Sequence, residues 1–220
     1  MANKTINSFS TASTSDSTHK MLVQKSDNTT ESLLVRRNGY HDLKPTGGYT
    51  PGGAASPAVG VFVAPLYELG FDGSGTNNVA TYRFHIPHDF VEGSDFFFHV
   101  HWSLNTVSPT GNVKWKVTWR YAQGYEHDAF NTEYVTTLPD ATVSSTQYAH
   151  HITESAAITP ASMSGKTVRT DGMIIASLER DTTDTNNDTA FMLEFDIHYL
   201  SDGTATVAKD DLTGTGFVKV

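Results

Sequence analysis

Large apolar residues alternate with polar ones over three stretches of this chain. Between Val113 and Tyr121 every second side chain is bulky and apolar, and the residues in between are Lys, Lys, Thr and Arg. The ranges 96–102 and 191–199 repeat the alternation. A period of two directs the apolar side chains to one face of a strand and the polar ones to the other. The pattern therefore predicts strands with one buried and one solvated face, as in an antiparallel sandwich.

The same period predicts which side chains fill the interior. They are the apolar members of each stretch: Phe96, Phe98, Val100, Trp115, Val117, Trp119, Phe195 and Ile197. An alternative is a sugar-binding platform made of the large rings, which are Trp102, Trp115, Trp119 and Tyr121. Their alternation with polar residues favours the core.

In the rest of the chain, turn residues indicate where the strands begin and end. Short strands at fairly regular spacing favour a sandwich or barrel, and a jelly roll of about eight strands fits best. Residues 1–60 have few bulky apolar side chains, and Gly and Pro interrupt their second half, so we expect an extended N-terminal arm and connector. A β-sandwich domain is expected over 61–205 and a tail or edge strand over 206–220. The predicted fold class is all-β, an antiparallel jelly-roll-like sandwich with a long extended arm.

Composition narrows the classes of partner. Lys and Arg number 15 against 24 Asp and Glu, a formal charge of −9, and there is no Cys. Phosphate backbones need clustered basic residues, so no nucleic-acid partner is predicted. Neither an apolar run of about 20 residues nor a secretory h-region is visible, which predicts no membrane association and synthesis in a reducing cytoplasm.

Four histidines fall on the polar faces of predicted strands. His99 and His101 leave the same face of one strand, and His85 and His198 lie on others. Imidazoles that converge across adjacent strands are what a zinc or iron site requires. The alternative is that they hydrogen-bond to cross-strand neighbours such as Glu194 or Asp196.

The spacing Gly93, five residues, His99-Val100-His101 resembles the opening of the first cupin motif. The glutamate that this motif places shortly after the second histidine is missing, with Leu104 and Asn105 there instead. The second cupin motif is not recognisable. We therefore predict that His99 and His101 bind no catalytic metal.

The loop 181–188 places oxygen-bearing side chains at alternate positions. Asp184, Asn186 and Asp188 match the first three side-chain ligands of a calcium loop, but Thr189 replaces the required glycine and Phe195 stands at position twelve. A solvated turn is the favoured interpretation. No nucleophile elbow and no phosphate-binding glycine loop is present either. We thus predict no catalytic, cofactor-binding or metal-binding residues, no cofactor and no enzymatic activity.

Several short segments resemble a group of tailed-bacteriophage structural proteins. They lie between Tyr82 and Asp202: His85-Ile86-Pro87-His88-Asp89-Phe90, Gly93-Ser94-Asp95, His99-Val100-His101-Trp102, Gly111-Asn112-Val113-Lys114-Trp115, Leu178-Glu179-Arg180-Asp181 and Asp196-Ile197-His198-Tyr199. The resemblance implies a decoration or cement protein on the capsid exterior. It also implies a β-sandwich homo-oligomer, with a trimer favoured, whose partner is the major capsid protein.

Two other functions stay open at this point. One is a receptor- or glycan-binding module of a tail or fibre, which would need a cleft lined with exposed aromatic rings. The other is a cupin-like metalloenzyme, which would need a metal at His99 and His101.

Overall fold

The computed structural model describes residues 19–24, 30–35, 39–52, 56–73 and 78–202. The chain divides into two compact units, Met1–Asn38 and Gly39–Val220. In the first unit, strand β1 (His19–Gln24) pairs antiparallel with β2 (Thr30–Val35), and His19 lies opposite Val35. Within this unit, the described part of the predicted arm is therefore a pair of antiparallel strands.

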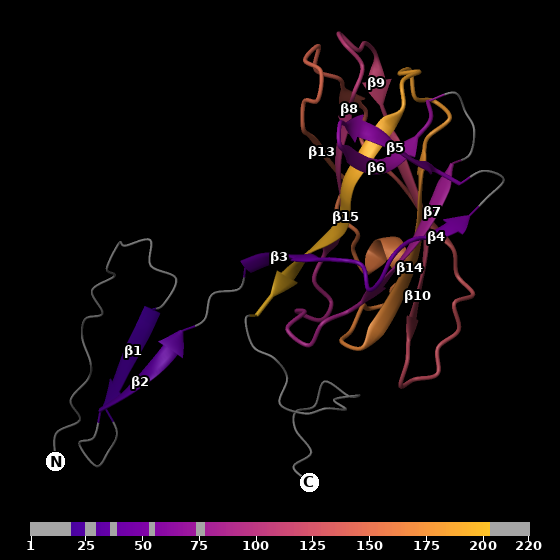
Figure 1. Cartoon of the computed structure of the whole chain (residues 1–220). Helices are drawn as coiled ribbons and strands as arrows, with labels where there is room; N and C mark the ends of the chain where they lie inside the picture. The colour runs from indigo at the N-terminus through magenta and orange to yellow at the C-terminus, as the bar shows by residue number, and fades with distance from the viewer. Residues whose placement is uncertain (1–18, 25–29, 36–38, 53–55, 74–77, 203–220) are drawn as a thin grey trace, which may run out of the picture. The chain divides into compact units, whose positions relative to one another are not determined.

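The second unit is built on two antiparallel sheets (Figure 1). One has five strands in the order β11 (Tyr134–Thr137), β10 (Trp115–Gln123), β14 (Gly172–Arg180), β7 (Val79–His85) and β4 (Thr50–Gly52). Buried and half-buried residues alternate along the whole of β14, as they do on a strand with one face in the core.

The other sheet has six strands. Its path runs β13 (His151–Glu154), β8 (Phe96–Leu104), β15 (Ala190–Ser201), β6 (Leu66–Phe71) and β5 (Ala58–Val63). The sixth strand, β3 (Gly39–Leu43), pairs with the C-terminal part of β15. A small ladder joins β9 (Asn112–Val113) to β12 (Ala141–Thr142), and a 3-10 turn covers Ala161–Met163.

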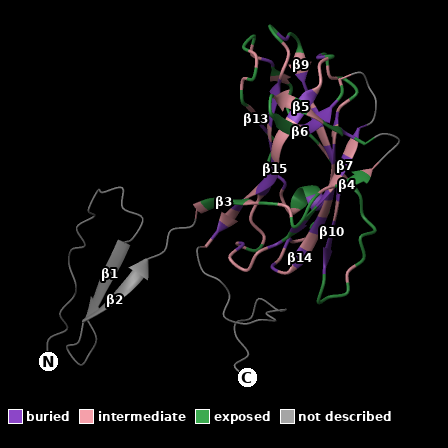
Figure 2. Ribbon diagram, in the orientation of Figure 1, coloured by how far each residue is buried: buried purple, intermediate pink, exposed green. Residues whose placement is uncertain are grey.

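Aromatic rings from both sheets meet between them. The ring centroids of Phe98 and Trp119 are 5.6 Å apart, and those of Phe84 and Phe195 are 5.4 Å apart. Both pairs have the edge-to-face geometry that aromatic quadrupoles favour. All eight side chains predicted to face the interior are buried, and the core runs between the sheets in Figure 2. The predicted all-β, antiparallel, jelly-roll-like sandwich is confirmed.

The sandwich begins earlier in the chain than the sequence indicated. β3, β4 and the first half of β5 lie inside the range assigned to the arm, yet each pairs with a strand of the sandwich. Pro51 is tolerated because β4 is an edge strand, where a missing N–H breaks no internal ladder. The predicted tail at 206–220 lies outside the described residues. Within the described ranges, no helix has the length and apolarity needed to cross a membrane.

Candidate functional site

Imidazole and carboxylate groups gather on the outer face of the six-stranded sheet. His99 and His101 leave β8 on the side opposite to the buried Phe98 and Val100. In the register of the sheet, His99 lies between two neighbours, Asp196 of β15 and Glu154 of β13.

The next row of this face is formed by His198 of β15 and Asp42 of β3, which are paired in register. We call His99, His101, Glu154, Asp196, His198 and Asp42 the histidine cluster.

Hydrogen bonds and ion pairs hold the cluster together. Nδ1 of His99 lies 3.0 Å from Oδ1 of Asp196, which confirms the predicted cross-strand contact. His198 lies between two carboxylates, with Nδ1 at 2.7 Å from Glu154 Oε2 and Nε2 at 2.8 Å from Asp42 Oδ1. The rings of His99 and His198 are 4.0 Å apart between centroids. Four strands thus contribute to one compact polar group.

Burial governs the charge of the two central members. His99 is 6% exposed and Asp196 only 1%, although both lie on an outer face. Burial, with His198 and His101 adding to it, lowers the pKa of His99 to about 4. Burial, with Asp42 adding to it, raises the pKa of Asp196 to about 7. At neutral pH His99 is therefore an uncharged imidazole, and its Nδ1 shares one hydrogen bond with Asp196.

Two further contacts border the cluster. Nδ1 of His101 lies 2.8 Å from Nε2 of His150, and burial, followed by His150, lowers the pKa of His101. Nζ of Lys44 lies 2.5 Å from Oε1 of Glu194. The ammonium group of Lys44 is thus already paired with a carboxylate of the same face.

His85, which the sequence placed with the other histidines, belongs to a different part of the molecule. It lies on β7 in the five-stranded sheet, and its Nε2 is 3.2 Å from Oδ1 of Asp171. The expectation that it joins His99 and His101 is wrong, because β7 and β8 follow each other in sequence but lie in opposite sheets.

The spacing of the cluster suits a metal ion. Three overlapping sets of residues each offer ligand atoms within 4.8 Å of one another: His99, His101 and Asp196; His99, Glu154 and His198; and Asp42, Asp196 and His198. Sequence reasoning missed Glu154 and Asp42, because β13 and β3 are short and lack strong alternation. Only the register of four strands reveals them.

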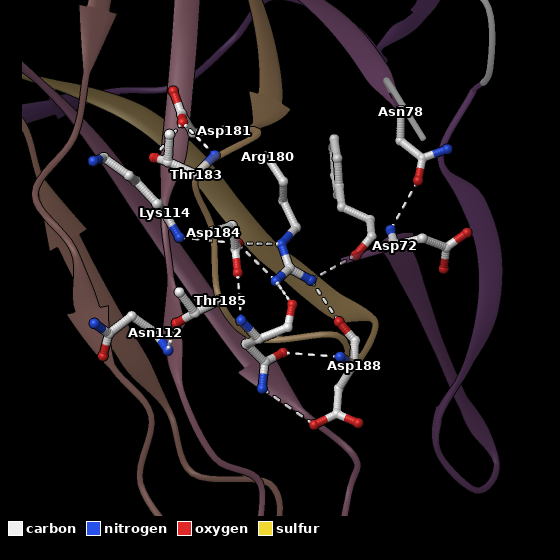
Figure 3. A network of polar contacts seen from close by, with 12 residues as sticks. Asp72, Asn78, Asn112, Lys114, Arg180, Asp181, Thr183, Asp184, Thr185 and Asp188 are labelled. Atoms are coloured by element: carbon white, nitrogen blue, oxygen red, sulfur yellow. Dashed lines mark hydrogen bonds and ion pairs between the residues drawn. The ribbon is translucent and has the colours of Figure 1, made fainter. Parts of the chain in front are cut away.

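The loop 181–188 is a turn with four exposed residues, as the sequence favoured, but its inner side is buried. The guanidinium of Arg180 lies within the loop and is only 4% exposed, and the Asp184 side chain is 2% exposed. Nε of Arg180 donates to Oδ2 of Asp184 at 2.7 Å, and the other nitrogens donate to carbonyl oxygens of Phe71, Asn186 and Asp188 (Figure 3). Of the three side chains that resembled calcium ligands, only Asp184 contacts this cation through its carboxylate, whereas Asn186 and Asp188 contact it through their backbone carbonyl oxygens.

Close packing holds this loop against its neighbours. Asn186 donates through Nδ2 to the carbonyl oxygen of Thr110 and is 1% exposed. Gly111 has φ of +89°, and a Cβ there would lie 2.8 Å from the carbonyl oxygen of Thr185. A side chain at this position would be strained both in backbone conformation and by contact.

The six-stranded sheet ends in an exposed apolar edge at β5, on the other side of the sheet path from β13. β5 is the last strand of that sheet, and Val59 and Val61 are 63% and 47% exposed. Leu66 and Tyr67 of the adjoining β6 are 58% and 62% exposed. We call these four residues the β5–β6 patch.

A cavity of about 340 Å³ lies beside β11, lined by Trp119, Glu133, Tyr134, Val135, Thr136, Ala156, Ala157, Ile158 and Ser162. Tyr134 stacks on Trp119 with 4.5 Å between ring centroids, so the indole face is covered. Trp102 and Trp115 are fully buried, which rules out the sugar platform that these rings were considered for.

The sequence and the structure of the chain were compared with those of known proteins, and only solved structures are similar to it. No protein-family model matches the chain, and no curated protein sequence matches it. Among solved structures, a xylan-binding module CBM15 is similar with a TM-score of 0.39 and 9% identity, covering 74% of this chain and 97% of that one. The CBM22-1 xylan-binding domain of Xyn10C from Paenibacillus barcinonensis is similar with a TM-score of 0.34 and 12% identity, covering 75% and 94%. At such low scores these likenesses carry no inference about a ligand.

Proposed function

We propose that the chain is a structural component of a tailed-phage particle, a decoration protein that binds across major capsid subunits and stabilises the head. The β5–β6 patch supports a role in binding another protein. The resemblance of the segments within 82–202 to tailed-phage structural proteins favours a phage particle as the assembly. The protein acts by burying surface rather than by chemistry. It works as a homo-oligomer, with a trimer favoured.

The patch has the properties of a docking edge. An edge strand presents unpaired N–H and C=O groups that a partner strand can join. Most exposed edges are protected by charged side chains or Pro, but β5 reads Ala-Val-Gly-Val-Phe-Val and carries neither. Its apolar side chains are exposed on the same edge and offer a partner apolar contact area. The carbonyl oxygen of Val61 already accepts from Nδ2 of Asn105 at 3.1 Å, so backbone pairing would be to other groups of the strand.

The experiment that tests this proposal is attachment to capsids. Val61→Lys places a charge on the edge of β5 without touching the core. Val135→Lys is the matched control, because Val135 is 59% exposed and lies on β11, an edge strand of the other sheet.

We expect Val61→Lys to weaken attachment to undecorated capsids at least tenfold, while Val135→Lys leaves it within about twofold, since a buried unpaired charge is costly. Equal attachment of wild type and Val61→Lys would contradict the proposed docking edge.

A glycan-binding tail or fibre module is the second candidate, and the cavity beside β11 is the observation that favours it. Its lining combines the Tyr134 ring with the carboxylate of Glu133, a pairing found in small-molecule sites. Glu133 accepts from Arg120, however, at 2.7 Å. Saturable glycan binding that Glu133→Gln abolishes would favour this candidate over the capsid role.

A further inference from the structure

We infer that His99, His198 and Glu154 bind a divalent transition-metal ion on the outer face of the six-stranded sheet. This site goes beyond the proposed docking function and is independent of it. The three residues come from three adjacent strands, β8, β15 and β13, and their ligand atoms lie within 4.8 Å of one another.

The spacing fits a coordination sphere. Ligands at about 2.0–2.2 Å from a tetrahedral ion lie roughly 3.3 Å from each other. Nδ1 of His198 and Oε2 of Glu154 are now 2.7 Å apart, so they need to separate slightly to admit an ion between them. Glu154 and His198 are partly exposed, with side chains at 44% and 25%, which leaves an entry path and freedom to adjust.

The orientation of the two imidazoles distinguishes this set from a chance cluster. Histidines that bind metals usually donate their second ring N–H to a carboxylate, which fixes the tautomer and the direction of the ring. Asp196 holds Nδ1 of His99 at 3.0 Å, and Asp42 holds Nε2 of His198 at 2.8 Å. His99 thus has Nδ1 held by a carboxylate outside the set, and of the two carboxylates that hold His198 only Asp42 lies outside the set, which leaves Nε2 of His99 and Nδ1 of His198 for the ion.

The surrounding charge also favours a cation. Four carboxylates lie on this face, those of Asp42, Glu154, Glu194 and Asp196, and the ammonium group of Lys44 is bonded to one of them, Glu194. Two imidazoles and a carboxylate are ligands that suit Zn²⁺, Fe²⁺, Co²⁺ or Ni²⁺, whereas Ca²⁺ and Mg²⁺ prefer oxygen alone.

Three protein ligands leave further coordination positions for water or for a group of another molecule.

The sequence predicted no metal here because the glutamate of the cupin motif is absent. In the structure the carboxylate comes from another strand, since Glu154 lies opposite His99 in the sheet register. The competing set of His99, His101 and Asp196 would instead use the carboxylate that orients His99, and Nδ1 of His101 already faces His150.

The test is Zn²⁺ binding by the full chain, prepared without an affinity tag and treated with chelator, followed by titration calorimetry. We expect one Zn²⁺ per chain. Glu154→Gln and His198→Gln should each reduce the affinity more than a hundredfold. Asp42→Asn should reduce it about 10- to 100-fold by releasing Nε2 of His198.

His101→Gln and His88→Gln are the controls. His101 adjoins the site but does not bind the ion, and His88 contacts Asp171 as His85 does, with its Nε2 3.0 Å from Oδ1. Both variants should keep the affinity within about threefold of wild type.

Co²⁺ gives a second readout, because its visible absorption reports nitrogen and oxygen ligands even where a variant is less stable. We expect bands in the wild-type protein that Zn²⁺ displaces and that Glu154→Gln alters. Absence of saturable Zn²⁺ binding by the wild type would overturn the inference. A loss in His101→Gln as large as that in Glu154→Gln would overturn the assignment of ligands.

Discussion

Arg180 shows how one side chain can organise a polar loop. Its guanidinium donates to one carboxylate and three carbonyl oxygens contributed by loop 181–188 and by the end of β6. A planar fork of N–H donors fits such a set, which an ammonium group could not satisfy with the same geometry. The loop that borders the β9–β12 end of the sandwich therefore depends on a single buried cation.

Replacement of Arg180 by Met should reduce the free energy of unfolding by about 3–5 kcal/mol, because the Asp184 carboxylate would stay buried without its partner. Urea denaturation measures this. The matched control is Lys116→Met on neighbouring β10, whose ion pair with Glu179 at 2.9 Å is more exposed. It should cost at most about 1 kcal/mol. Similar losses in both variants would show that the Arg180 network does not stabilise the fold.

His151 gives the protein a pH dependence that can be isolated. Its ring stacks on buried Trp102 with 4.2 Å between centroids, and burial, with His150 adding to it, lowers its pKa. Between that lowered value and the ordinary pKa of about 6.5 the unfolded chain binds more protons than the folded one. Stability contributed by neutral His151 is thus present above pH 6.5 and is lost as the pH falls toward its folded pKa.

His151→Phe keeps a ring on Trp102 and removes the titration. The melting temperature of the wild type should fall more between pH 7.5 and pH 5 than that of the variant. Parallel melting curves at both pH values measure the difference. Identical shifts in the two proteins would mean that His151 stays neutral, or titrates alike, in both states.

Among the strands, β10 contributes three buried aromatic rings, those of Trp115, Trp119 and Tyr121. Trp119 is 2% exposed and contacts Phe96 and Phe98 of the opposite sheet, each with 5.6 Å between centroids. Trp119→Ala should therefore reduce the free energy of unfolding by roughly 3–5 kcal/mol.

Val135→Ala, at a position 59% exposed on the adjacent β11, is the control and should change the free energy of unfolding by less than about 0.5 kcal/mol. Chemical denaturation of both variants measures these changes in the free energy of unfolding. A loss below about 1 kcal/mol for Trp119→Ala would indicate that the two sheets pack more loosely than the ring contacts imply.

The sequence revealed strands where alternation was long and missed those where it was short. β8, β10 and β15 each have at least nine residues, enough to show a period of two, and all eight side chains predicted to face the interior are buried. β3 and β4 have five and three residues and contain Gly or Pro, which locally favour a connector. Their pairing is decided by tertiary contacts that no local pattern records.

The same limit applies to the candidate site. His99 and His101 were visible because they lie two apart on one strong strand. Glu154 and Asp42 join them only through the register of β13 with β8 and of β3 with β15. The burial of Asp184 was missed because the sequence does not show that Arg180 turns back into the loop.

For the whole molecule, the division at Asn38 and Gly39 predicts where the chain can be shortened. A protein lacking residues 1–38 should keep the melting temperature of the full chain within a few degrees, because all strands of the sandwich remain. Removal of residues 1–52 also deletes β3 and β4, which pair with β15 and β7. This longer deletion should unfold at a clearly lower temperature or fail to fold.

The shorter deletion also tests the predicted arm. If residues 1–38 contribute contact area on the capsid, the shortened protein should oligomerise normally and attach more weakly than the full chain. Calorimetry measures the melting temperature and capsid co-sedimentation measures attachment, so the same preparations separate a loss of stability from a loss of binding. Undiminished attachment would remove the arm from the proposed function, and a failure to fold would place the domain boundary elsewhere.

The position of β15 has a consequence for how the protein is made. β15 pairs with β8 along one edge and with β6 and β3 along the other, so three strands that precede it by about 85 to 150 residues of chain cannot complete their pairing until it is made. Before the ribosome has added β15, the six-stranded sheet lacks its central strand, and β8, β6 and β3 each have an unpaired edge. Until this segment emerges, the nascent chain cannot complete this sheet, and its unpaired strands stay exposed. Synthesis at high polysome density would then favour pairing between neighbouring nascent chains, and slower initiation should raise the yield of soluble protein.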